Sequence, residues 1–236
     1  MDNEKRGEGM SVFRMTGYDR TLLELRLMTA EFGGAVREHL EKALATLKSD
    51  IQEDWHMRDE VIDQARDQIV RRCFEIMGLQ QLRDQDLRWL LGYQRIAQEL
   101  ERIADYACDV AELSELRADR IWSPEILHMA GHLVSMFDGA LAGLREEKAL
   151  TLDLDDQDNR LDQIYAELQK ELIRASRKQK MDQELGFKLL LARTMERMGD
   201  HVVNVAGELL FVQTGQRRSF AQSERKGQRH EGVEER

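Results

Sequence analysis

Apolar residues recur along most of the chain at spacings of three and four residues, which is the period of one helical face. The pattern predicts six helices, at residues 18–48, 55–77, 84–117, from Ser123 onward, 156–177 and 182–213. Gly78 and Gly215 are expected to end helices, and Pro124 follows the cap residue Ser123 at the first helical position, where a missing N–H costs little. Helices of this length joined by short turns are expected to pack antiparallel on their neighbours.

The chain contains an internal duplication. The segment RIAQELERIADYACDVA at residues 95–111 aligns without gaps with LLARTMERMGDHVVNVA at residues 190–206, and six of the seventeen positions are identical. Upstream, MRDEVIDQARDQI at residues 57–69 parallels DQDNRLDQIYAEL at residues 156–168. Chance similarity between helices explains matched apolar positions but not acidic pairs at matched places. The sequence therefore predicts two related units in tandem.

The duplication and the helical pattern together predict an all-α protein of two tandem three-helix bundles, with six long antiparallel helices. We expect the first repeat at residues 18–120 and the second at residues 121–215. The stretches at residues 1–17 and 216–236 carry few core-forming side chains and are predicted to be a flexible N-terminal tail and a disordered C-terminal tail.

Composition narrows the class of protein. A single proline in 236 residues, 34% charged residues and 6% aromatic residues are typical of helices rather than sheets. The net charge of -10 argues against direct nucleic-acid binding. No apolar run approaches the length of a membrane span, the start lacks a signal-peptide core, and Cys73 and Cys108 form no CxxC motif. These features predict a cytosolic protein.

Each repeat carries two pairs of acids at a spacing of four residues. The pairs are Asp59 and Asp63, Glu101 and Asp105, Asp158 and Asp162, and Glu196 and Asp200. This spacing places like charges on one helical face, where they repel by roughly 0.2–0.5 kcal/mol per pair. If the second and third helices of each repeat form an antiparallel hairpin, the pairs converge into an all-oxygen site that suits Mg, Ca, Mn or iron. Asp109 and Asn204, one turn further on, are possible additional ligands.

A second interpretation needs no metal, because arginines close in sequence are also suitable salt-bridge partners for these acids. They are Arg58, Arg66, Arg102, Arg193 and Arg197. The repetition of the acids in register favours metal, and both interpretations stay open.

Two Glu-x-x-His motifs offer another arrangement of ligands. Glu53 precedes His56, and Glu125 precedes His128, with His132 one turn beyond. The motif occurs in di-iron four-helix proteins. Here both copies fall at helix starts or in turns, and neither has a counterpart in the other repeat, so we predict exposed polar residues.

The stretches ERIADYACDVAE and ERMGDHVVNVAGELLFVQTG resemble the PhoU family of bacterial phosphate-signalling proteins. The similarity covers about residues 18–215 and is most specific in the second repeat. The first repeat departs from the family pattern at three positions, with Ala104 for the glycine, Tyr106 for the histidine and Asp109 for the asparagine. Its site is therefore expected to differ in charge or in metal preference.

The resemblance implies a non-enzymatic cytoplasmic regulator that keeps phosphate uptake and the phosphate-starvation response low. Its implied partners are the ATPase subunit of the phosphate transporter and a membrane sensor histidine kinase, with membrane contact only through them. It also implies a homodimer, and a divalent or multinuclear metal (iron, Mn, Mg or Zn) held by the eight paired acids. The alternatives are a carboxylate-bridged metal enzyme, either an oxidase or a hydrolase, and a bundle without metal.

Overall fold

The computed structural model of the protein describes residues 17–49, 54–79, 82–116, 122–146, 154–177 and 183–216. Within these ranges the chain forms six helices, close to the predicted positions. They are α1 (Gly17–Ala45), α2 (Trp55–Leu79), α3 (Asp84–Glu115), α4 (Pro124–Glu146), α5 (Leu154–Arg177) and α6 (Gln183–Thr214). The predicted tails lie outside the described residues, except for Gly17 and Gln216. The boundaries of the two repeats stay predictions.

The predicted helix ends are confirmed at two places and wrong at a third. Gly215 has a φ of 76°, and its N–H donates to the carbonyl of Phe211 at 2.8 Å, which ends α6. Pro124 is the first residue of α4. In contrast, α2 continues through Gly78 and ends at Leu79. Gly78 does not take the left-handed conformation of a capping glycine, and a helical glycine costs only about 1 kcal/mol relative to alanine, so a helix can include it in its last turn.

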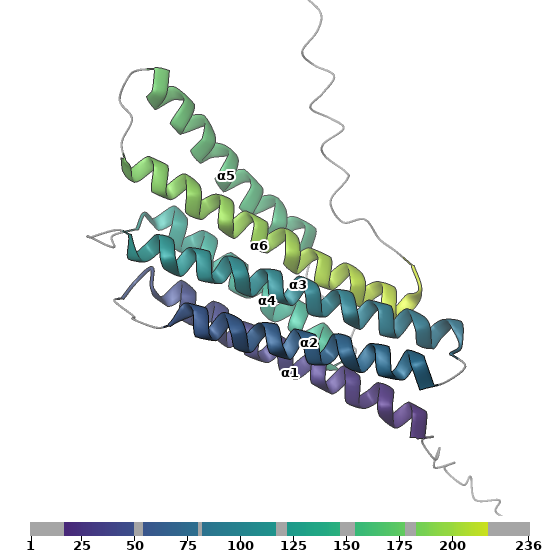
Figure 1. The fold of residues 1–236 in the computed structure, drawn as a ribbon. Helices are drawn as coiled ribbons and strands as arrows, with labels where there is room; N and C mark the ends of the chain where they lie inside the picture. Colours follow the sequence, from purple (N-terminus) through teal and green to yellow (C-terminus); the bar gives the residue numbers. More distant parts are fainter. Residues whose placement is uncertain are drawn as a thin grey trace, which may run out of the picture.

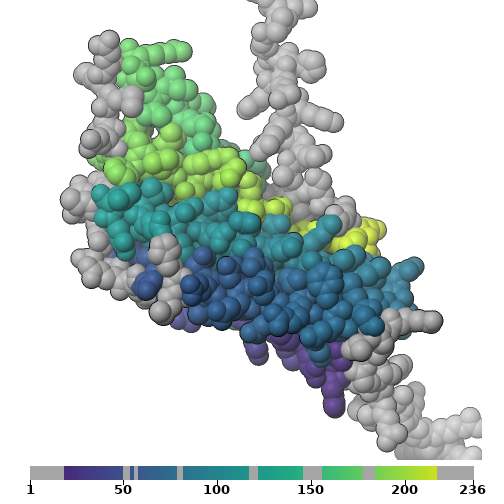
Figure 2. Space-filling view, viewed as in Figure 1, coloured from purple at the N-terminus to yellow at the C-terminus, as the bar shows by residue number. Residues whose placement is uncertain are grey.

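The helices form two layers (Figure 1). Helices α2, α3, α6 and α5 lie side by side in that order, and α1 and α4 lie behind them. Among the six described helices, α3 and α6, the third helices of the two repeats, make the most extensive contact, and α1 also contacts α4. In the space-filling view α2, α3 and α6 form one continuous surface (Figure 2).

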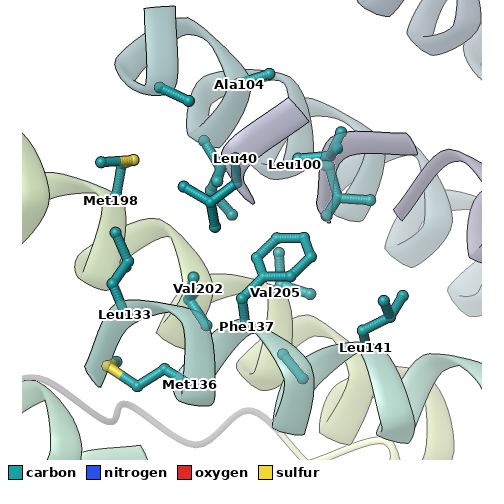
Figure 3. Close-up of a cluster of buried hydrophobic side chains, with 14 of the residues drawn as sticks. Leu40, Leu100, Ala104, Leu133, Met136, Phe137, Leu141, Met198, Val202 and Val205 are labelled. Carbon is teal, nitrogen blue, oxygen red and sulfur yellow. The ribbon is translucent and has the colours of Figure 1, made fainter. Parts of the chain in front are cut away.

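The two repeats share one hydrophobic core. Figure 3 shows Leu40 and Leu100 of the first repeat facing Leu133, Phe137 and Val202 of the second. All five side chains are buried. The duplicated units are therefore halves of a single packed body. Among the described residues, no helix has both the length and the apolar character that crossing a membrane requires.

The crossing of α3 and α6 depends on Gly92. A Cβ atom at Gly92 would overlap Cγ2 of Val212, and the stiff β-branched side chain of valine cannot swing away. We expect Gly92→Ala to lower the free energy of unfolding by about 1–3 kcal/mol, measured by urea denaturation. Gly131→Ala on α4 is the matched control, because within the described residues no side chain and no other helix lies within 4 Å of its Cβ position. The control should gain up to about 1 kcal/mol. Equal shifts in both variants would contradict close packing at Gly92.

Candidate functional site

Glu101 is the most buried acid of the first repeat's predicted set. It lies on α3 between the buried residues Leu100 and Ile103, and 6% of its surface is exposed. Burial raises the pKa of its carboxyl, the charges of Asp105 and Asp63 also raise it, and Arg102 and Arg66 offset the rise only in part. The carboxyls of Asp63 on α2 and of Glu101 and Asp105 on α3 therefore lie near enough to affect one another across the hairpin of these helices.

Arg66 joins the two helices of this hairpin. Its Nη1 donates to Oε1 of Glu101 on α3 at 2.8 Å, and its Nη2 lies 3.2 Å from Oδ1 of Asp63 on α2. On α3 itself, Nη1 of Arg102 donates to Oδ2 of Asp105 at 2.9 Å. The salt-bridge contacts that the sequence offered as the alternative to metal are therefore present in the structure.

Asp59 differs from the other three paired acids of the first repeat. Its Oδ1 is buried and accepts no hydrogen bond in the part of the chain that the structure describes. Burial raises the pKa of Asp105, and the charge of Asp59 is the next cause, so the two carboxyls lie close together. A buried carboxylate oxygen without a donor costs about 1–3 kcal/mol or more. A cation bound at this oxygen would remove that cost. An ordinary cluster of surface ion pairs contains no such buried oxygen without a donor.

The second repeat brings its acids together on α5 and α6. Glu196 is 5% exposed, and burial, followed by the charges of Asp200 and Asp162, raises the pKa of its carboxyl. A Cβ at Gly199 would lie 3.3 Å from Oδ1 of Asp158 and 2.6 Å from Cδ1 of Leu161. The glycine of the ERMGDH stretch therefore lets α5 approach α6 closely and places Asp158 beside the backbone of α6.

The arginine that donates a hydrogen bond to the buried glutamate comes from a different helix in each repeat. Arg66 of α2 supplies it in the first repeat, but the equivalent position in the second repeat is Tyr165. There Nη1 of Arg193, on α6, donates to both carboxylate oxygens of Glu196 at 2.7 and 2.6 Å. The Cζ atom of Arg193 lies 5.3 Å from the centroid of the Tyr165 ring, a cation–π contact that holds the guanidinium in place.

The donor chemistry fits a hard divalent cation, but the side chains do not form a ready coordination shell. Among the residues that the structure describes, no three His, Cys, Asp or Glu side chains are grouped so that they could hold an ion. The glutamates instead contact Arg66 and Arg193. An ion at these acids would have to displace the guanidiniums, which compensate the buried charge only in part.

Asn204, a possible additional ligand, makes its contact outside the acidic set. Its Nδ2 donates to Oε2 of Glu99 on α3 at 3.0 Å, and Nδ1 of His201 lies 2.7 Å from the same oxygen. Burial raises the pKa of Glu99, but these two contacts outweigh it and the net pKa is lowered. Sequence comparison missed Glu99 because its counterpart is Thr194. The other possible ligand, Asp109, is exposed one turn beyond Asp105 on α3.

Tyr106 and His201 occupy equivalent positions of the two repeats and contact each other. Their rings stack with centroids 5.6 Å apart and planes at 30°. Two equivalent residues can meet in this way only beside the axis that relates the repeats. The hydroxyl of Tyr106 accepts a hydrogen bond from Nη1 of Arg197 at 3.0 Å. The departure of the first repeat from histidine at this position therefore supplies a contact between the repeats.

The raised pKa values of Glu101 and Glu196 predict that ionisation of these carboxyls lowers the free energy of unfolding of the metal-free protein in a pH-dependent way. A carboxyl whose pKa is higher in the folded chain than in the unfolded chain lowers stability when it is ionised. Its penalty is complete above the raised pKa and absent below the ordinary one. In the presence of a chelator, we expect the Glu101→Gln, Glu196→Gln double variant to unfold at higher urea concentration than wild type at about pH 8. Its advantage should shrink as the pH falls toward about 4.3. An advantage that does not change with pH would contradict the assignment.

The fold and the site define a class of protein: a duplicated all-helical bundle with paired acids on the second and third helices of each half. The PhoU domain model matches residues 29–114 and 126–209. The chain therefore belongs to the PhoU family, with two PhoU domains, and the predicted fold of two tandem three-helix bundles is confirmed.

Relatives and solved structures agree with this assignment. The phosphate-specific transport system accessory protein PhoU homolog of Streptococcus pneumoniae is 28% identical over 207 residues, which cover 84% of this chain and 96% of that protein. The crystal structure of the phosphate transport system regulatory protein PhoU from the same organism matches with a TM-score of 0.74 and 25% identity, over 86% of this chain and 99% of that chain. PhoU from Pseudomonas aeruginosa has the same fold, with a TM-score of 0.75 and 24% identity, over 84% of this chain and all of that chain.

Proposed function

We propose that this protein is a non-enzymatic accessory protein of phosphate transport that restrains phosphate uptake and phosphate-starvation signalling. In this role it links the ATPase subunit of the transporter to a sensor histidine kinase in the cytoplasm. Membership of the PhoU family supports the proposal, as does the similarity to a Streptococcus pneumoniae protein named as a transport accessory protein, almost all of whose length aligns with this chain.

One observation carries the proposal beyond the family name: a buried, ionisable glutamate stands at the same position on each of the two central helices. Glu101 and Glu196 both have raised pKa values, so their burial costs stability in metal-free protein. Acids kept at such a cost are candidates for a functional role. Both lie on helices of the α2, α3, α6 and α5 layer, so one broad partner surface laid on that layer could contact both halves.

We further propose that these acids bind divalent metal when the guanidiniums of Arg66 and Arg193 move aside. The ligands would come from the α2–α3 hairpin in the first repeat and from the α5–α6 hairpin in the second. They are Asp59, Asp63, Glu101, Asp105, Asp158, Asp162, Glu196 and Asp200. The orphaned Oδ1 of Asp59 supports the proposal, and an all-oxygen donor set favours Mg, Mn or iron over zinc.

The regulatory role is tested by deleting the gene in its own host and measuring phosphate-starvation transcripts in high phosphate. We expect the transcripts to rise on deletion and to fall again when the wild-type protein is supplied in trans. The Glu60→Ala variant is a matched control, because Glu60 is an exposed acid of α2 outside the paired set. It should restore repression fully. Transcript levels that do not change on deletion would contradict the role.

A further inference from the structure

Two histidines on α4 lie outside the acidic sets. His128 and His132 are four residues apart, so they share one face of the helix. Their ring centroids are 4.4 Å apart and their planes meet at 76°. His128 is exposed and His132 is half-buried. The predicted exposure of Glu125 and His128 at the start of α4 is confirmed, and the structure adds the contact between the two rings. The other Glu-x-x-His motif lies outside the described residues, because they include neither Glu53 nor the side chain of His56.

The ring of His132 is oriented by the neighbouring helix. Its Nδ1 lies 3.0 Å from Oε1 of Gln157 on α5. An amide oxygen only accepts hydrogen bonds, so Nδ1 is the donor in this contact, and in the neutral ring Nε2 then keeps a free lone pair. Histidines that bind metals usually donate their other ring N–H to an oxygen in this way, which fixes the tautomer and the ring orientation. Gln157 therefore orients the ring of His132 in the way that a metal-binding histidine is usually oriented.

We propose that His128 and His132 form a site for one transition-metal ion of intermediate hardness, namely Zn²⁺, Ni²⁺ or Cu²⁺. Two histidines at positions i and i+4 of a helix can both reach one ion, as they do in helical zinc sites. Imidazole ligands suit these metals, whereas the all-oxygen acidic pairs suit harder ions. No third acid, cysteine or histidine in the described residues is grouped with the pair, so water completes the coordination shell.

Binding of the ion strengthens the attachment of α5. The contact between α4 and α5 is the least extensive among the helix pairs that touch, and the bond from His132 to Gln157 bridges it. A cation on Nε2 makes the Nδ1–H of the same ring a stronger donor. The site therefore ties α5 more firmly to α4 when metal is bound. The binding itself depends neither on the regulatory role nor on metal at the acidic pairs.

The test is a titration of the full chain with Cu²⁺, followed by electron paramagnetic resonance, together with calorimetric titration with Zn²⁺. The copper spectrum should show coupling to imidazole nitrogens. His128→Ala and His132→Ala should each lower the affinity roughly 10- to 100-fold, and Gln157→Ala about 10-fold. Thermal denaturation should show a rise in Tm on adding Zn²⁺ to wild type and a smaller rise in both histidine variants.

Two control variants separate this site from other ligands. His230→Ala removes a histidine distant in sequence, and the Glu101→Gln, Glu196→Gln double variant removes the two buried acids of the acidic pairs. Both controls should keep the nitrogen coupling and the wild-type affinity for Cu²⁺. Circular dichroism confirms that each variant is folded. The proposal is overturned if the histidine variants bind as tightly as wild type, if the copper spectrum lacks nitrogen coupling, or if the acid double variant loses the site.

Discussion

Replacing Phe137 by alanine is expected to lower the free energy of unfolding of the whole chain by roughly 3–5 kcal/mol. Phe137 lies on α4 with 2% of its surface exposed. Its ring points into the core that the two repeats share, toward Leu100 of α3 and Val202 and Val205 of α6 (Figure 3). These side chains already border a small apolar void. Removing the ring enlarges that void, and rigid helices on both sides limit how far it can collapse.

Urea denaturation followed by circular dichroism and tryptophan fluorescence measures this change. We expect one transition at lower urea concentration with both probes, because α4 of the second repeat packs on helices of both repeats. Phe74→Ala on α2 is a control of identical chemistry at a side chain that is 60% exposed. It should change the free energy of unfolding by no more than about 0.5 kcal/mol. Two separate transitions, with only one shifted, would instead show that the repeats unfold as independent domains.

Protein purified without chelator is expected to carry divalent metal, and the Glu101→Gln, Glu196→Gln double variant to lose it. Glutamine keeps the shape of the side chain but removes the negative charge that attracts the ion. We expect the affinity for Mn²⁺ to fall roughly 100-fold or more in the double variant. Each single variant should affect the ion in its own repeat. Elemental analysis of the purified proteins and calorimetric titration with Mn²⁺ measure content and affinity.

Glu171→Gln is the matched control for this experiment, because Glu171 is an exposed acid of α5 outside the paired set. Its metal content should equal that of wild type. The His128→Ala variant serves as a second control, since it removes a nitrogen ligand without touching the acids. If wild type carries no metal and binds no Mn²⁺, the contacts of Arg66 and Arg193 with the glutamates are the complete explanation of the acidic pairs.

The helices and the positions of the acids follow from local sequence pattern. The three- and four-residue spacing of apolar side chains predicts each helix, because one face of a helix repeats at that period. Pro124 and Gly215 mark helix ends by backbone chemistry that is local as well. The duplication predicts which helices are equivalent, and the spacing of four predicts that each acidic pair shares a face. Gly78 shows the limit of such signals, because α2 continues one residue past it with no left-handed turn at the glycine.

The charge partners of the acids could not be read from the repeat. Arg66 contacts Glu101 from α2, whereas Arg193 contacts Glu196 from α6 itself. A guanidinium therefore lies beside the buried glutamate in both repeats, although it comes from a different sequence position in each. Tyr165 stands at the position equivalent to Arg66. Comparing equivalent positions cannot detect such an exchange, because it depends on which side chains reach across a helix interface.

The packing of the two halves is the other feature that depends on the folded molecule. Contacts such as Glu99 with His201, Tyr106 with His201, and Arg37 with Asp138 join residues about a hundred positions apart. Helical periodicity tells which face of a helix is apolar, but not which other helix will cover it. Association of α3 with α6 and of α1 with α4 selects these pairs, because these contacts bury apolar faces of both repeats at once. The result is one shared core, with Tyr106 and His201 stacked beside the axis that relates the two repeats.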